Sequence, residues 1–235
     1  MSGAEEITLL FLPGAGGTAS KWRRVKERVQ QYRCVFADLP GHGSNETPPC
    51  PTVADYAESL KSLIVGKTIV IGHSMGGLIG LELAATHPDV VGLVLAASHY
   101  RLPVDSKVFD KLEGGVFPNG LFYASYSKQV DPQLLEEERS ELQLVPLETT
   151  LLDYRCCDAY EKGKQRLADF EKPLLAIYGQ DDRMLPADAR DDLQALVPQA
   201  ASSVIPDAGH YVMLEAADRF ASALLPFVQQ IRNRQ

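Results

Sequence analysis

Lys67-Thr-Ile-Val-Ile-Gly-His-Ser-Met-Gly-Gly77 is the stretch of sequence that indicates the fold. Its apolar first half, Lys67–Ile71, predicts a strand, and a helical pattern runs from about Met75 to His87. Between them lies a G-x-S-x-G pattern centred on Ser74. A tight strand-to-helix turn requires small residues two positions before and two positions after such a serine. The pattern therefore predicts a serine hydroxyl held above the edge of a sheet, beside the N-terminus of a helix.

Short apolar runs alternate with helical patterns on both sides of this stretch. Strands are predicted at Ile7–Leu12, Arg33–Ala37, Val90–Ala97, Leu174–Tyr178 and Ser203–Ile205, and helices at Ser20–Gln31, Val53–Ile64, Ala187–Leu196 and Val212–Arg232. Apolar runs without strict alternation are typical of parallel strands covered on both faces. Because strand–helix alternation builds right-handed βαβ units, the sequence predicts an α/β fold with a doubly wound, mainly parallel sheet.

The alternation stops after Ser98 and resumes at Pro173. With 235 residues, the chain is expected to form one large domain. We expect residues 1–98 and 173–235 to form its core and residues 99–172 to form a cap insertion over one edge of the sheet. Helices are predicted within this insertion at Pro132–Leu144 and Thr149–Phe170.

Charge and composition exclude several classes of protein. The formal net charge of −8 argues against a nucleic-acid partner. No apolar run approaches the about 20 residues of a membrane span, and the N-terminus does not resemble a signal peptide, so we expect a cytoplasmic protein. The spacing of the cysteines predicts neither a metal site nor a disulfide framework, and the adjacent Cys156 and Cys157 have no assigned role.

A serine hydroxyl is a poor nucleophile unless a base accepts its proton. His210 is the best candidate base, since Asp207-Ala-Gly-His210 follows the last predicted strand and would lie at the same sheet edge as Ser74. The base needs a carboxylate to orient it. Tyr178-Gly-Gln-Asp-Asp182 follows another strand and offers two, Asp181 and Asp182.

Two backbone amides are candidates for binding an oxyanion. The N–H of Met75 lies at a helix N-terminus, where backbone N–H groups are free. Ala15, in the glycine-rich loop after the first strand, is expected to supply the second. The candidate residues for lining the substrate are Gly14, His42, His99 and Tyr211.

Five motifs together resemble the α/β-hydrolase superfamily, over almost the whole chain. They are Pro13-Gly-Ala-Gly-Gly17, Asp38-Leu-Pro-Gly-His-Gly-Ser44, Gly72-His-Ser-Met-Gly-Gly77, Gly179-Gln-Asp-Asp-Arg-Met-Leu-Pro186 and Ala208-Gly-His-Tyr-Val-Met-Leu-Glu215. The resemblance implies a triad of Ser74, Asp182 and His210, an oxyanion hole at Ala15 and Met75, and no metal or cofactor. It also implies that the family's N-terminal hairpin is missing, which leaves about six strands in the order 2-1-3-4-5-6. Pro13 stands where many members have histidine, a feature that resembles type II thioesterases.

The substrate class is predicted from the cap. The chain resembles small carboxylesterases and also a menaquinone-pathway synthase, which tends to have arginine where this chain has Leu78. The cap holds nine basic and twelve acidic residues between Arg101 and Arg166, a net charge of −3 that argues against an anion-binding pocket. Its aromatic residues favour small apolar acyl or aryl esters. We therefore predict a serine esterase that acts on a small-molecule ester or thioester as a monomer or homodimer.

Several alternatives to an esterase remain open. A thioesterase, a C–C bond hydrolase and the menaquinone-pathway lyase could each use the same triad. A ligand receptor on this fold is a further hypothesis, although such proteins often lack a triad residue, whereas Ser74, Asp182 and His210 are all present here.

Overall fold

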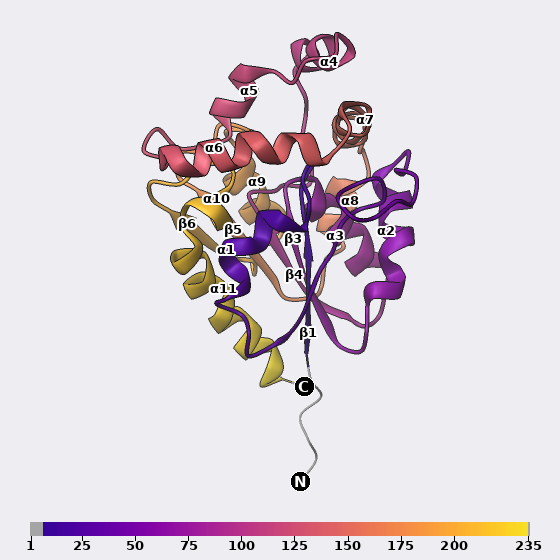
Figure 1. Cartoon of the computed structure of the whole chain (residues 1–235). Coiled ribbons are helices and arrows are strands. Elements are labelled where there is room, and N and C mark those ends of the chain that lie inside the picture. Colours follow the sequence, from indigo (N-terminus) through magenta and orange to yellow (C-terminus); the bar gives the residue numbers. More distant parts are fainter. Residues whose placement is uncertain (1–6, 235) are drawn as a thin grey trace.

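The computed structural model describes residues 7–234, in which six parallel strands form one sheet (Figure 1). The strands are β1 (Thr8–Leu12), β2 (Arg33–Phe36), β3 (Thr68–His73), β4 (Val90–Ala96), β5 (Leu174–Gly179) and β6 (Ala201–Ile205). Their spatial order is β2-β1-β3-β4-β5-β6, which confirms the predicted fold class and strand order. The strand after β1 is added at one edge of the sheet, whereas β3 and the later strands are added towards the opposite edge. Such a change in strand order between β1 and β3 opens a crevice at the carboxyl ends of these two strands.

Helices cover both faces of the sheet, which explains why the central strands are apolar throughout. In β1 every residue is buried: Leu10 and Leu12 pack with α2 (Val53–Leu60) and α3 (Met75–Thr86), while Leu9 and Phe11 face α1 (Arg23–Lys26) and α11 (Ala217–Arg232). Figure 1 shows these two helix layers on opposite sides of the strands. The hydrophobic core is thus divided into two halves by the sheet.

Several predicted helices are shorter in the structure or are divided into two. In place of one helix over Ser20–Gln31, a 3₁₀ turn at Ala19–Trp22, capped by the Thr18 side chain, leads into the short α1. The apolar side chains that suggested the longer helix, Trp22, Val25 and Val29, are nevertheless fully buried. The predicted C-terminal helix is broken at Ala216 into α10 (Val212–Glu215) and α11, and the helix before β6 is α9 (Ala189–Leu196).

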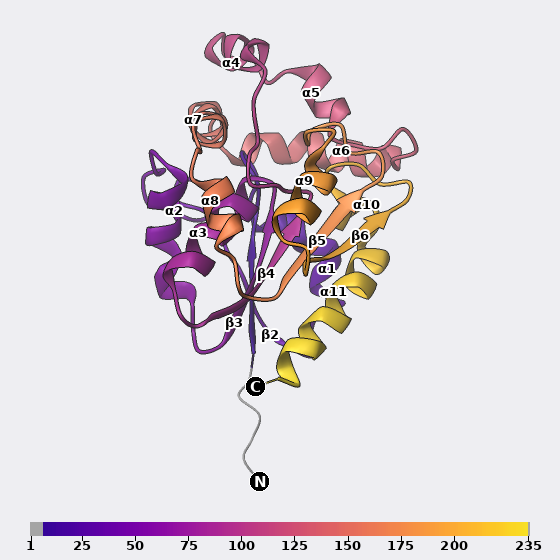
Figure 2. The same cartoon turned by 180° about the vertical axis from the view of Figure 1, so that it is seen from behind.

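The segment between β4 and β5, residues 99–172, is called the cap segment below. It contains five α-helices, and a 3₁₀ turn at Leu142–Leu144 directly after the third of them. The helices are α4 (Ser106–Glu113), α5 (Asn119–Ala124), α6 (Pro132–Glu141), α7 (Leu147–Asp158) and α8 (Gly163–Ala168). Both views show α4 to α7 above the carboxyl ends of the strands (Figure 1 and Figure 2). The helix predicted over Thr149–Phe170 is divided into α7 and α8, and α8 returns to α3, where Arg166 forms an ion pair with the buried Glu82.

All four cysteines are free thiols. None of the helices in residues 7–234 combines the length and the apolar character needed to cross a membrane.

Candidate active site

Ser74 lies on a strained turn between β3 and α3. Its backbone has φ 50° and ψ −120°, a conformation that costs energy for any residue with a side chain. The turn is so tight that it leaves no room for a side chain two residues before or two residues after the serine. A Cβ atom on Gly72 would lie 2.1 Å from the carbonyl oxygen of Gly76, and one on Gly76 would lie 2.5 Å from the carbonyl oxygen of Pro13. The two glycines of the G-x-S-x-G pattern are therefore required by packing.

His210 and Asp182 meet at the carboxyl edge of the sheet, on the loops that follow β6 and β5. His210 Nδ1 donates a hydrogen bond of 2.9 Å to Asp182 Oδ2, and the Asp182 side chain is 4% exposed. Asp182 Oδ1 accepts the backbone N–H groups of Met184 and Leu185. Asp182, and not the neighbouring Asp181, is thus the carboxylate that contacts His210.

The pKa of Asp182 lies below its usual value. Burial alone would raise it, but the charge and hydrogen bond of His210, together with the two backbone N–H donors, outweigh burial. An ionised carboxylate accepts hydrogen bonds only, so Nδ1 of His210 must carry a hydrogen. In the neutral ring the lone pair is then on Nε2, which leaves that atom able to accept a proton.

Two backbone amides near Ser74 have no hydrogen-bond acceptor among residues 7–234. Met75 is the first residue of α3, a position at which the N–H has no acceptor within the helix. Ala15 follows β1, and its N–H has no hydrogen-bond partner among residues 7–234. Ala15 lines the same cavity as Ser74 and His210.

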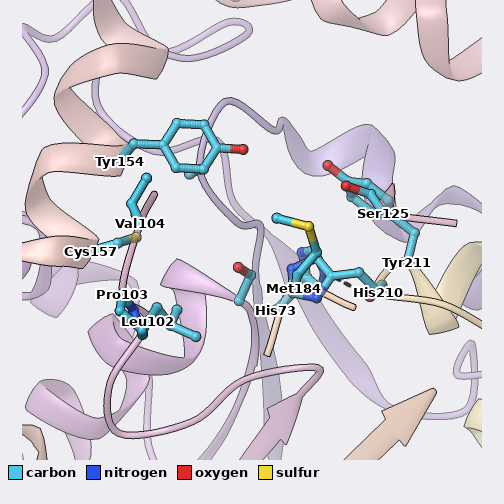
Figure 3. Close-up of a pocket in the computed structure, with 12 residues that line it drawn as sticks. His73, Leu102, Pro103, Val104, Ser125, Tyr154, Cys157, Met184, His210 and Tyr211 are labelled. Atoms are coloured by element: carbon cyan, nitrogen blue, oxygen red, sulfur yellow. Dashed lines mark hydrogen bonds between the residues drawn. The ribbon is translucent and has the colours of Figure 1, made fainter. Parts of the chain in front are cut away.

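The cavity above Ser74 is small, about 50 Å³, and mostly apolar. Figure 3 shows its two sides, with Tyr154 of α7 reaching in between them from the cap segment. One side is formed by Leu102, Pro103, Val104 and Cys157, and the other by His73, Ser125, Met184, His210 and Tyr211.

Of the four residues that the sequence suggested for lining the substrate, one lines the cavity above Ser74. Tyr211 lines the cavity, whereas Gly14 is not among the lining residues and lies so close to His73 and Ser74 that a Cβ atom would collide with both. His42 and His99 are not among the residues that line the cavity. His42 is buried against Asp153, and His99 is fully buried 3.7 Å from Asp192.

Several lining residues have no counterpart among the sequence-derived candidates. Ser125, Tyr154, Cys157 and the segment 102–104 all belong to the cap segment, for which the sequence contains no motif. Met184 is different, because it lies two residues after Asp182 on the same loop, and that proximity could have identified it.

Charged side chains connect two of the site's loops to the cap segment. Arg183, next to Asp182, donates from Nη2 to the carbonyl oxygens of Tyr123 (2.9 Å) and Tyr126 (2.8 Å). Glu215 accepts the N–H of Gly209, next to His210, and the N–H of Ser127, both at 2.9 Å. The backbone N–H of His210 itself donates to the carbonyl oxygen of Ser125 at 2.9 Å. The loops of the candidate acid and base are therefore fixed to residues 123–127.

In the part of the chain that the structure describes, no group of three or more His, Cys, Asp or Glu side chains is arranged to hold a metal ion.

The sequence profile of the alpha/beta hydrolase family matches residues 9–223, and the chain belongs to this family. Its relatives are named esterases, lipases and other hydrolases, and the chain is accordingly a hydrolase. A pimeloyl-(acyl-carrier protein) methyl ester esterase of Xanthomonas campestris pv. campestris is 29% identical over 221 residues, which cover 87% of each chain.

A lipase is similar to this chain in sequence, and a solved esterase is similar to it in fold. Lipase 3 of a Moraxella species is 26% identical over 239 residues, covering 88% of this chain and 73% of the lipase. A thermophilic esterase from Thermogutta terrifontis, known from a solved structure, superposes with a TM-score of 0.85 over 98% of this chain and 92% of its own, at 22% identity.

Proposed function

We propose that the protein is a serine esterase that cleaves small apolar carboxylic esters through an acyl-enzyme. The observation that carries this proposal is the 2.9 Å hydrogen bond from His210 to Asp182. His210 lines the same cavity as Ser74, which lies on a strained strand-to-helix turn. Such an arrangement supplies a nucleophile, a base and a carboxylate that orients the base.

In the proposed reaction Ser74 Oγ attacks the ester carbonyl, and its proton moves to His210 Nε2. The carbonyl oxygen becomes an oxyanion, which accepts hydrogen bonds from the Ala15 and Met75 amides. As the C–O bond to the leaving group breaks, the proton passes from His210 to the alcohol. Water then attacks the acyl group with His210 again as the base, which releases the carboxylic acid and restores Ser74.

Asp182 has two roles in this scheme. It accepts the Nδ1–H of His210, so the lone pair stays on Nε2, and its negative charge stabilises the imidazolium ion that forms in each half of the reaction. The lowered pKa of Asp182 keeps it ionised at neutral pH.

The substrate is proposed to be small and apolar because of the cavity. Leu102, Val104 and Met184 offer only hydrocarbon and thioether surface to an acyl or alkyl group. The esterases and lipases among the relatives support an oxygen ester as the bond cleaved.

The test is hydrolysis of a series of p-nitrophenyl acyl esters and the matching thioesters. Ser74→Ala should lower kcat by about 10⁴-fold or more, because the nucleophile is lost while the fold is kept. Ser222→Ala, which removes an exposed hydroxyl on α11, is the matched control and should behave like the wild type. Activity retained in a folded Ser74→Ala variant would refute the proposal.

Two other results would favour a different function. A preference for thioesters by orders of magnitude would identify a thioesterase. A wild-type protein that neither turns over any ester nor reacts at Ser74 with a fluorophosphonate probe would favour a ligand receptor.

A further inference from the structure

Asp153 of α7 is a fully buried carboxylate that binds three parts of the core at once. Its Oδ2 accepts the backbone N–H of Gly16 at 2.8 Å and faces His42 Nε2 at 2.7 Å. Its Oδ1 accepts the Tyr56 hydroxyl at 2.8 Å. Asp153 is 0% exposed and does not line the cavity above Ser74, so its hydrogen bonds all go to the protein.

His42 neutralises the charge of this buried carboxylate. Its Nδ1 lies 2.9 Å from the carbonyl oxygen of Pro40, and its Nε2 faces Asp153, so both ring nitrogens meet acceptors and both must carry hydrogen. Burial alone would lower the pKa of His42, but the hydrogen bond and the charge of Asp153 raise it above its usual value. The site is thus an ion pair with its hydrogen bonds satisfied, as a buried charge requires.

Gly16 is the residue directly after Ala15, which supplies the proposed oxyanion donor. The two are the central residues of a four-residue turn closed by a 3.0 Å hydrogen bond from the Gly17 N–H to the Gly14 carbonyl oxygen. Gly16 has φ +62°, and Ala15 has a negative φ, which makes the turn type II. A type I turn would need a negative φ at Gly16 and an opposite orientation of the Ala15–Gly16 peptide. The Gly16 N–H would then point away from Asp153.

The face of α7 that holds Gly16 is shaped to the turn. Thr150 and Asp153 are three residues apart and so lie on the same side of the helix. A Cβ atom on Gly16 would lie 2.9 Å from the Thr150 side chain, and the Gly16 N–H is bonded to Asp153. The turn is therefore held in one conformation by a helix more than 130 residues further along the chain.

From these contacts we infer that Asp153 is a positioning residue for the oxyanion hole: by binding the Gly16 N–H it anchors the Gly14–Gly17 turn, and with it the adjoining Ala15, whose N–H is the proposed oxyanion donor. This inference rests on the proposed function. Asp153 touches neither the substrate nor the reacting atoms, and it acts through Gly16.

Loss of the Asp153 contact should affect kcat more than KM, because the oxyanion exists at only some stages of the reaction. It forms in the transition states of acylation and deacylation, and not in the bound ester, so a misplaced Ala15 amide lowers kcat and leaves KM nearly unchanged. Complete removal of an oxyanion donor costs about 10²–10³-fold in kcat. A turn that is released but still present should cost less, about 10- to 100-fold.

Three variants separate positioning from general stability. Asp153→Leu removes both acceptor oxygens while keeping a similar volume, and it should lower kcat about 10- to 100-fold with little change in KM. Asp153→Asn keeps an oxygen for Gly16 and can turn its NH₂ group to the Tyr56 oxygen. It should therefore retain most of kcat, although the protein is less stable without the charge opposite His42.

Tyr56→Phe is the matched control. It removes one hydrogen bond of Asp153 and leaves the bond to Gly16, so it should lower the melting temperature and leave kcat close to the wild-type value. If Asp153→Leu does not fold, Asp153→Ser replaces it, because serine leaves room for water beside His42 and cannot reach Gly16. A kcat for the folded variant equal to that of Tyr56→Phe would overturn the inference.

A measurement on the wild-type protein tests the same bond without activity. NMR should detect a scalar coupling across the hydrogen bond between the Gly16 amide nitrogen and the Asp153 Cγ carbon, and its absence would also overturn the inference. The exposed Gly66 provides the reference for an amide free of such coupling. A coupling in a wild-type protein that hydrolyses no ester would leave the contact intact and refute the proposed function. If the wild type hydrolyses esters and the Asp153→Leu variant has the same kcat, the proposed function stands and the inference about Asp153 is refuted.

Discussion

His73 Nε2 donates a hydrogen bond of 3.1 Å to the backbone carbonyl oxygen of His210. The residue directly before the proposed nucleophile thus holds the backbone of the proposed base. Burial, reinforced by the nearby charge of His210, lowers the pKa of His73 well below its usual value. His73 therefore remains neutral at working pH, with its hydrogen on Nε2, because a carbonyl oxygen can only accept.

Replacing His73 by Phe should lower kcat about tenfold, since the ring is kept but the hydrogen bond that places His210 is lost. His73→Gln restores a side-chain N–H donor and should recover part of the loss. Both are measured as kcat with a p-nitrophenyl ester, next to the melting temperature. An unchanged kcat in a folded His73→Phe variant would show that His210 is placed by its other contacts alone.

Asp182→Asn should lower kcat by about 10⁴-fold, because an amide NH₂ facing Nδ1 favours the tautomer with hydrogen on Nε2, which cannot accept the serine proton. Asp181→Asn is the matched control, since Asp181 has the same chemistry one residue away and does not bond His210. Steady-state kinetics at pH 8 decides between them, and an equal loss in both variants would contradict the assignment of the acid.

Gly72→Ala should destabilise the protein by about 3 kcal/mol or more, because a Cβ atom 2.1 Å from the Gly76 carbonyl oxygen forces the turn apart. Gly120→Ala is a suitable comparison, as its Cβ atom would meet nothing within 4 Å and alanine favours the helix α5. Urea unfolding of the two variants gives the difference. A Gly72→Ala variant as stable as the wild type would mean that the turn can relax.

His99 should make stability depend on pH between about 6.5 and 4. Its burial, despite Asp192 nearby, lowers its pKa to about 4, so the unfolded chain binds its proton at a higher pH than the folded chain does. Stability is then complete above the unfolded pKa and falls as the pH drops towards the folded one. From pH 7.5 to pH 5, the wild type should lose about 2 kcal/mol more than His99→Gln. Parallel urea titrations of both proteins would reveal the difference, and identical losses would rule it out.

Val104→Phe should shift substrate preference towards shorter acyl groups, because Val104 lines the cavity above Ser74. Each methylene that can no longer be buried costs about 0.8 kcal/mol, so kcat/KM should fall more for octanoyl than for acetyl esters. Val116→Phe, on an exposed part of the cap segment, is the control and should leave the profile unchanged. The same loss for all chain lengths would mean that Val104 contacts the substrate near the carbonyl.

The sheet and the residues at its carboxyl edge could be predicted from the sequence because their signals are local. A buried parallel strand must be apolar throughout, and the turn at Ser74 admits only glycine at two positions. The strand order then follows from connection rules and from the resemblance to a known family. Ser74 and His210 could be named because they lie in segments that follow predicted strands, whereas Asp182 was distinguished from Asp181 only by the resemblance to a known family.

The cap segment could not be predicted to the same extent, because its contacts join residues far apart in the chain. Nothing near Asp153 in the sequence indicates a bond to Gly16, and nothing near His42 indicates that its partner is on α7. His42 is a sequence-derived candidate for lining the substrate. The structure places it against the buried carboxylate of Asp153 on α7, outside the set of residues that line the cavity above Ser74.

The contacts of Asp153, Arg183 and Glu215 bear on how this enzyme could be re-engineered. Each joins a loop that follows a strand to the cap segment, and each has one partner inside residues 99–172 and the other outside. A chimaera made by exchanging those residues for the corresponding part of a relative would remove the Asp153 carboxylate, and it would keep the other two contacts only if backbone groups returned to the places of the Tyr126 carbonyl and the Ser127 N–H. Grafting should succeed only when the loops at Gly16, Arg183 and Gly209 are transplanted together with the segment they hold.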